Sequence, residues 1–81
     1  MTRKAKLYAA MKANPRGDWT IADVQAVCSN YGLSCKSPTR GSHFTLSHVT
    51  IKGHLTVPAR RPIKEIYIRL LIEMVESLEL P

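Results

Sequence analysis

Acidic residues are scarce in this sequence of 81 residues and are missing from its middle. Six Asp and Glu residues stand against twelve Lys and Arg residues, which gives a formal net charge of +6 at pH 7. Residues 36–64 contain six of these cations and all three histidines, but no Asp or Glu. An ordinary solvated surface does not require acids to be excluded over so long a stretch. The distribution therefore favours a polyanion as the partner.

Long apolar runs are missing as well. No segment approaches the roughly 20 apolar residues that a membrane-spanning helix needs. The charged residues at 1–4 are not followed by the apolar stretch that is typical of a signal peptide. We therefore expect a cytoplasmic protein with no membrane partner.

Cysteine and histidine are too few, and too widely spaced, for a scaffold or a metal centre. Cys28 and Cys35 are seven positions apart, so they form neither a disulfide framework nor a CxxC pair. His43, His48 and His54 lack the paired spacing of a zinc site. We expect free thiols, no metal and no small-molecule cofactor.

The length corresponds to one small domain, and no repeat, linker or low-complexity segment divides it. We expect a single domain over residues 1–81, with its core at about residues 20–79. Residues 3–14 favour helix by propensity. This helix should end at Asn14, because the residue before a proline resists the helical conformation.

The signals for a second helix are stronger and cover residues 21–30. Asp18 or Thr20 can serve as its N-cap, and Asp23 stands at the capping-box position relative to Thr20. Gly32 follows at the C′ position, where a left-handed residue commonly ends a helix.

Three strands are expected after this helix. Residues 33–37, 43–48 and 54–57 have the composition or the alternation of strands, and residues 49–53 are ambiguous. The connections are short, which implies an antiparallel meander. Helices before and after a three-stranded antiparallel sheet predict an α+β fold with the helices packed on one face.

The final helix is expected to begin with Pro62 just before or at its first position. One apolar stripe should face the sheet: Ile63, Ile66, Tyr67, Leu70, Met74 and Leu78. Four further apolar residues widen it: Ile68, Leu71, Ile72 and Val75. The excess either completes the core of a small domain or contacts a partner protein.

The stretch at residues 40–46 offers the most specific chemistry. Gly41 can take a positive φ in a tight turn before the strand. Phe44 and Leu46 should then lie on the buried face, which leaves His43 on the opposite face. A histidine held by a strand beside Arg40 suits proton transfer on a phosphodiester, although a surface histidine without a function is the alternative.

These residues resemble the HicA toxin family. The resemblance extends from about residue 20 to residue 78. It rests on Arg40-Gly41-Ser42-His43, then Leu55-Thr56-Val57-Pro58, and then a final helix in the same order of elements. A second histidine that many members carry is here Phe44, and the usual Gly-Thr-Leu near the last helix is replaced by residues 65–69.

The resemblance implies a fold similar to the double-stranded-RNA-binding domain, preceded here by an extra helical segment. It implies a ribosome-independent mRNA endonuclease that arrests growth, and a cognate antitoxin of the HicB type as its protein partner. The family's catalytic histidine falls on His43.

RNA cleavage without a metal needs a base for the 2′-hydroxyl, an acid for the leaving oxygen and cations for the phosphorane. Histidine can perform either proton step near neutral pH. No carboxylate near His43 in the sequence fixes its tautomer, so we expect weak catalysis. The residues expected to contact RNA are Lys36, Arg40, Ser42, Lys52, Arg60, Arg61 and Lys64.

Two other functions fit the same sequence. One is an RNA-binding module without catalysis, which would read the RNA backbone by shape through the same basic rim. The other is a small interaction protein that docks a partner through its C-terminal helix. Loss of the phenotype in a His43→Ala variant would distinguish the toxin from the plain binder.

Overall fold

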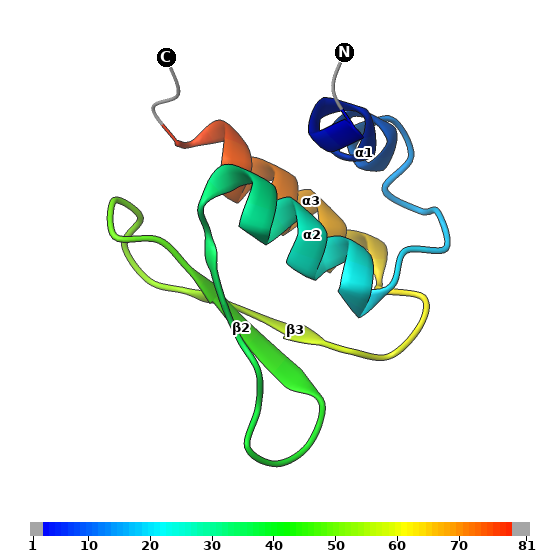
Figure 1. Ribbon diagram of the computed structural model, residues 1–81. Helices are drawn as coiled ribbons and strands as arrows, with labels where there is room; N and C mark the ends of the chain where they lie inside the picture. Colours follow the sequence, from blue (N-terminus) through cyan, green and yellow to red (C-terminus); the bar gives the residue numbers. More distant parts are fainter. Residues whose placement is uncertain (1–2, 79–81) are drawn as a thin grey trace.

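The computed structural model describes residues 3–78 as an α+β fold (Figure 1). Its elements are α1 (Arg3–Ala13), α2 (Ile21–Tyr31), β1 (Ser34–Lys36), β2 (His43–Ser47), β3 (Leu55–Pro58) and α3 (Glu65–Glu76). The predicted order is confirmed, and each strand lies within two residues of its expected bounds. The predicted end of the core, residue 79, lies outside the described residues. No helix in residues 3–78 is long and apolar enough to span a bilayer.

β2 is the central strand of an antiparallel sheet in the order β1-β2-β3. Lys36, the last residue of β1, pairs with Thr45, whereas His43 pairs with Pro58 of β3. His43 and Phe44 therefore extend beyond β1 and pair with β3 alone. The start of β2 is the point where the sheet narrows to two strands.

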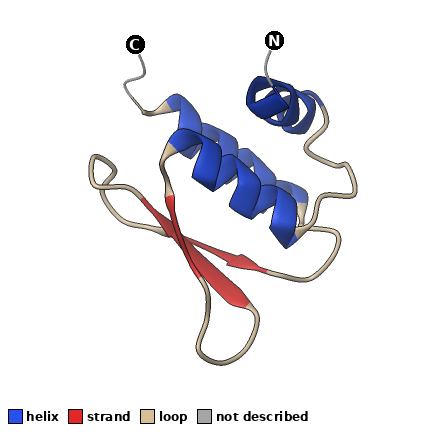
Figure 2. Ribbon diagram, viewed as in Figure 1, coloured by secondary structure: helices blue, strands red, loops and turns tan. Residues whose placement is uncertain are grey.

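The helices cover one face of this sheet in two layers (Figure 2). α2 packs against β1 and α3 against β3, and α1 contacts both of these helices on the side away from the sheet. The rings of Tyr8 and Tyr31 join α1 to α2 edge to face, with centroids 5.2 Å apart. Lys12 of α1 donates to Glu76 of α3. The helical prediction for residues 3–14 is thus confirmed, and this helix forms a third layer.

The predicted boundaries of α2 are confirmed by its caps. The side chain of Thr20 accepts from the amide of Asp23, and Asp23 accepts from the amide of Thr20 in return. Gly32 ends the helix with φ 74°, and the amide of Leu33 donates to the carbonyl of Cys28. The left-handed conformation at Gly32 suits a residue without a Cβ.

α3 begins later than predicted, because Glu65 and not Pro62 opens the helix. Two contacts hold the segment before the helix in place. The Ile63 amide donates to the carbonyl of Trp19 at 2.8 Å, and Arg61 pairs with Asp18. The approach to the helix is therefore tied to the segment that leads into α2.

The predicted sheet-facing stripe of α3 is partly wrong. The buried residues of this helix are the four expected only to widen the stripe: Ile68, Leu71, Ile72 and Val75. Ile66, placed within the stripe, is 56 % exposed, and Leu70 and Met74 are half-buried. The reason is that α3 packs against α1 as well as β3, which moves its most buried side away from the strands. The apolar excess serves the protein's own core.

The core joins all three layers. Its fully buried side chains are Met11, Val24, Val27, Cys28, Leu46, Val57, Ile68 and Leu71. Leu46 takes the buried face of β2 as predicted. Phe44 lies on the same side of the strand but is only half-buried, because it stands near the strand's narrow end. Val57, the register partner of Phe44, is fully buried, so the packed part of the sheet reaches the second residue of β2 and only His43 projects past it.

Candidate functional site

The outward face of the sheet is polar and carries His43. Along β2, His43 is exposed while Leu46 is fully buried, as the strand period requires. Lys36, Thr45 and Thr56 share the outward face through the register of the three strands. This arrangement confirms the predicted placement of His43 and Thr45 opposite the apolar face.

The backbone around His43 is fixed on both sides. Gly41 has φ 79°, the positive value predicted for the turn. The amide of Ala59 donates to the carbonyl of Ser42 at 2.7 Å, which continues the β2–β3 pairing one step past His43. The ring of His43 itself makes no hydrogen bond to the described part of the chain. Both of its nitrogens are free for a ligand.

A hollow lies where β3 leads into α3. It is lined by Pro58, Arg60, Arg61, Pro62, Lys64 and Tyr67, has a volume of about 410 Å³, and is called the basic hollow below. It gathers three of the predicted RNA contacts in one place. His43 does not line the hollow, but Pro58, one of its lining residues, is the register partner of His43 on the neighbouring strand.

The three cations of the basic hollow differ in whether an acidic residue is paired with them. Arg61 makes a two-pronged ion pair with Asp18, with a Nη2–Oδ2 distance of 2.7 Å and a Nε–Oδ1 distance of 3.0 Å. Hydrogen bonding to Arg61 lowers the pKa of Asp18 below its usual value. Arg60 and Lys64 have no ion-pair partner within the described chain. They are the cations available to an incoming anion.

The nearby acid on α3 is also neutralised. Glu65 accepts from Arg69 at 2.6 Å and from Arg16 at 2.7 Å. Its pKa is lowered, first by the hydrogen bond from Arg69 and then by that from Arg16. Glu65 directly follows the acid-free stretch of residues 36–64. Because its charge is balanced by Arg69 and Arg16, it does not neutralise Arg60 or Lys64.

Helix polarity adds to the positive potential at this end. Both α2 and α3 begin on the side of the molecule where β2 starts and β3 ends (Figure 1). The amino end of a helix carries partial positive charge. Each helix also carries an acid in its first turn, Asp23 in α2 and Glu65 in α3, which offsets part of this charge. The cations Arg60 and Lys64 are therefore the main source of attraction for an anion at this edge.

The remaining predicted contacts divide between the two ends of the sheet. Arg40 and Ser42 are exposed in the turn that precedes β2. Lys36 lies on the outward face of β1, opposite Thr45, which is two residues after His43. Lys52, in contrast, lies in the connection after β2. A strand of five residues separates it from His43, roughly 13 Å at the usual rise per residue. Lys52 does not join the cations around His43.

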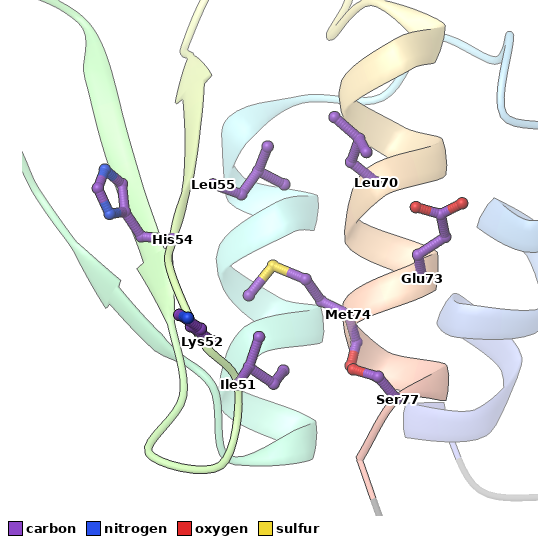
Figure 3. Close-up of a pocket in the computed structure, with 8 residues that line it drawn as sticks. All are labelled: Ile51, Lys52, His54, Leu55, Leu70, Glu73, Met74 and Ser77. Atoms are coloured by element: carbon purple, nitrogen blue, oxygen red, sulfur yellow. The ribbon is translucent and has the colours of Figure 1, made fainter.

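Lys52 instead borders a second groove, between α3 and the start of β3 (Figure 3). The side chains of Leu55 and Met74 point toward each other across it, and Ile51 closes one end. Glu73 on its rim is exposed. This groove differs from the basic hollow in its charge, because its lining holds one cation, Lys52, and one acid, Glu73.

The other two histidines have different surroundings from His43. The amide of Thr50 donates to Nδ1 of His48 at 3.1 Å, and the Thr50 hydroxyl lies 2.7 Å from the same nitrogen. Nδ1 of His48 therefore acts as an acceptor, which places the proton on Nε2. His54 is exposed beside the groove of Lys52. Both rings lie at the opposite end of the β2–β3 pair from His43.

The thiols offer no nucleophile. Cys28 and Cys35 are free, as predicted. Burial, with a smaller effect of the neighbouring Cys35, raises the pKa of Cys28 to about 12. Burial also raises the pKa of Cys35. Because only a thiolate is strongly nucleophilic, both side chains are unreactive near neutral pH. In residues 3–78 no three His, Cys, Asp or Glu side chains gather as a metal site.

Tyr67 is a lining residue that sequence reasoning assigned to the core stripe alone. It is half-buried, packs against the core and also forms part of the basic hollow. The sequence spacing could have revealed this role, because Tyr67 follows Lys64 by three residues and residues three apart lie on the same side of a helix. A basic run followed at helical spacing by an aromatic residue is a pattern suited to nucleic acid.

Comparison of the chain with protein-family models, with curated proteins and with solved structures found no match.

Proposed function

We propose that this chain is a metal-independent endoribonuclease, the mRNA-cleaving toxin of a toxin–antitoxin pair. The observation that carries the proposal is the setting of His43, an exposed imidazole on a fixed strand. Its register partner Pro58 lines the basic hollow together with Arg60 and Lys64, which have no ion-pair partner in residues 3–78. The resemblance of Arg40-Gly41-Ser42-His43 and Leu55-Thr56-Val57-Pro58 to the HicA family supports the same assignment.

In the proposed reaction, His43 takes the proton of an RNA 2′-hydroxyl, and that oxygen attacks the adjacent phosphorus. The bond from phosphorus to the 5′-oxygen breaks, and the leaving oxygen takes a proton from water. The products are a 2′,3′-cyclic phosphate and a 5′-hydroxyl. Arg60, Lys64 and Arg40 offset the charge of the phosphorane. Catalysis by one histidine alone predicts slow turnover.

The proposed partner is an antitoxin of the HicB type that covers His43 and the basic hollow. A covering surface must carry acids to balance Arg60 and Lys64 and to compete with RNA. Co-expression should restore growth and give a stable complex on gel filtration. Recovery of the chain alone, non-toxic and without a binding protein, would count against this part of the proposal.

The decisive experiment uses purified parent protein and His43→Ala on an end-labelled RNA, with and without EDTA. The parent should cleave in both conditions and leave a 2′,3′-cyclic phosphate or its 3′-phosphate product. His43→Ala should lose about 10²- to 10⁴-fold in rate, the usual contribution of a general base. Because His43 is exposed, the variant should keep the parent's circular dichroism spectrum and melting temperature.

Two results would overturn the catalytic assignment. One is cleavage by His43→Ala at the parent's rate, and the other is complete loss of the parent's activity in EDTA. Either result on folded protein would remove His43 or the metal-free mechanism from the proposal.

A non-catalytic RNA-binding module is the second candidate, and one observation favours it. No described side chain accepts from or donates to the His43 ring, so the chain does not orient its tautomer for proton transfer. In that case RNA binding and any effect on growth would persist in His43→Ala. Growth after induction of this variant distinguishes the two candidates.

A further inference from the structure

The basic hollow has a lining that suits a flat aromatic ring. Two prolines and an aromatic residue form its apolar part, and Arg60 and Lys64 stand beside them. Tyr67 contributes aromatic surface while its ring also packs against the core, which limits its freedom. A flat aromatic group with negative charge on either side matches this lining.

The walls of the basic hollow are held in place without a ligand. The Ala59 amide is bonded to the Ser42 carbonyl, and the Ile63 amide is bonded to the Trp19 carbonyl. Between these two points Arg61 is paired with Asp18. The segment that lines the hollow is thus fixed at three places, so binding need not order it first, which favours affinity.

The position of the basic hollow relative to His43 is set by the strand pair. Opposite residues of an antiparallel pair have Cα atoms about 4.5–5.5 Å apart, and Pro58 stands opposite His43. One lining residue of the hollow is therefore within about one nucleotide's length of the His43 backbone.

We propose that the basic hollow binds one unpaired nucleobase beside the phosphate at His43, so that the substrate is single-stranded RNA. Tyr67 provides the stacking surface, and Arg60 and Lys64 contact the flanking phosphates. A base within a duplex is paired and stacked, so it cannot enter the hollow without being turned out of the helix. This inference rests on the proposed function, since it assigns the substrate of the same site.

The test measures binding without cleavage. A 2′-O-methyl RNA lacks the attacking hydroxyl, and three forms are compared: a short single strand, its duplex, and single strands with one abasic position at each place in turn. The parent should bind the single strand at least about tenfold more tightly than the duplex. One abasic position should weaken binding about five- to hundredfold, the range for loss of one stacked base.

Tyr67→Ala should lose a similar factor on the intact strand, and Tyr67→Phe should retain the parent's affinity. If Tyr67→Ala does not fold, the abasic series on parent protein still decides. Equal affinity for single strand and duplex, or an abasic series without any weakened position, would overturn the inference. Preference for the intact single strand by a parent that never cleaves the 2′-hydroxyl RNA would uphold the inference and remove the catalytic proposal.

Discussion

The two ends of the sheet carry similar residues but differ in what those residues can do. One end carries His43, Arg40, Arg60 and Lys64. Its acids Asp18 and Glu65 are paired with arginines, and a third acid, Asp23, is bonded to Thr20 at the start of α2. At the other end, His54 and Lys52 border an apolar groove whose rim includes an exposed Glu73. A histidine and a hollow are present at both ends, so neither feature alone marks the functional one.

The difference lies in which charges are left unbalanced. The fold ties Asp18 and Glu65 to arginines and brings the amino ends of α2 and α3 to the His43 end. The positive electrostatic potentials of the unpaired cations and of the helix amino ends add up, and a cleft concentrates the resulting field. The basic end therefore attracts anions more strongly than a count of Lys and Arg along the chain suggests.

The largest effect is expected on toxicity, where substitution of His43 should differ from substitution of His48 or His54. Induced expression of the parent should arrest growth, and His43→Ala should abolish the arrest, in line with a loss of about 10²- to 10⁴-fold in cleavage. His54→Ala is the matched control, because His54 is exposed beside a groove whose lining holds one cation, Lys52, and one acid, Glu73. It should remain toxic, as should His48→Ala. Equal loss in His54→Ala would break the distinction between the ends.

Substitutions at the two ends of β2 should differ in their effect on the free energy of unfolding. Leu46→Ala removes a fully buried side chain and should lower the free energy of unfolding by about 2–5 kcal/mol. Phe44→Ala, on the same side of the strand but half-buried at the basic end, should cost only about 1 kcal/mol. Urea unfolding of both variants gives the comparison. A larger loss for Phe44→Ala would show that the start of β2 is part of the packed core.

RNA affinity should depend on the cations of one end. If Lys36, Arg40, Arg60 and Lys64 each meet a phosphate, the log–log salt slope on single-stranded RNA should be about −3, at about −0.7 per contact. Replacing Arg60 and Lys64 together by alanine should reduce its magnitude by about 1.4. Lys52→Ala should leave the slope unchanged, because Lys52 lies beyond the far end of β2. A flat salt response of the parent would remove the polyanion partner altogether.

Local signals were enough to predict most of the fold. The Thr20–Asp23 capping box, Gly32 and the alternation around Leu46 act over a few residues, so each fixed its element correctly. The start of α3 was misplaced because Pro62 permits a helix start but does not require one. What delays the helix is the contact with Trp19, more than 40 positions away in the sequence.

The candidate site was predictable only in part for the same reason. His43 and its face follow from the strand period, and the grouping of Arg60, Arg61 and Lys64 follows from their proximity in sequence. The pairing of Arg61 with Asp18, the separation of Lys52 and the dual place of Tyr67 depend on tertiary contacts. The stripe on α3 was shifted because the sequence does not say that α1 packs on it.

The smallest expected effect concerns the one paired cation of the basic hollow. Hydrogen bonding to Arg61, followed by its charge, lowers the pKa of Asp18 in the folded protein. A carboxyl group with a lowered folded pKa stabilises the protein fully above its unfolded pKa of about 3.9, and this contribution is lost as the pH falls through the folded value. Arg61→Gln should therefore lower the urea midpoint slightly at pH 6, and the difference should vanish near pH 2. The effect is small because the pair is exposed.

Arg60→Gln is the control for this titration, since Arg60 is adjacent, exposed and without an ion-pair partner in residues 3–78. It should leave the urea midpoint unchanged at both pH values while weakening RNA binding. Arg61→Gln should do the reverse, with a midpoint shift and a smaller change in RNA affinity. If the two variants instead behaved alike in both measurements, Arg61 would contact RNA as Arg60 does, and the ion pair with Asp18 would not hold the segment before α3.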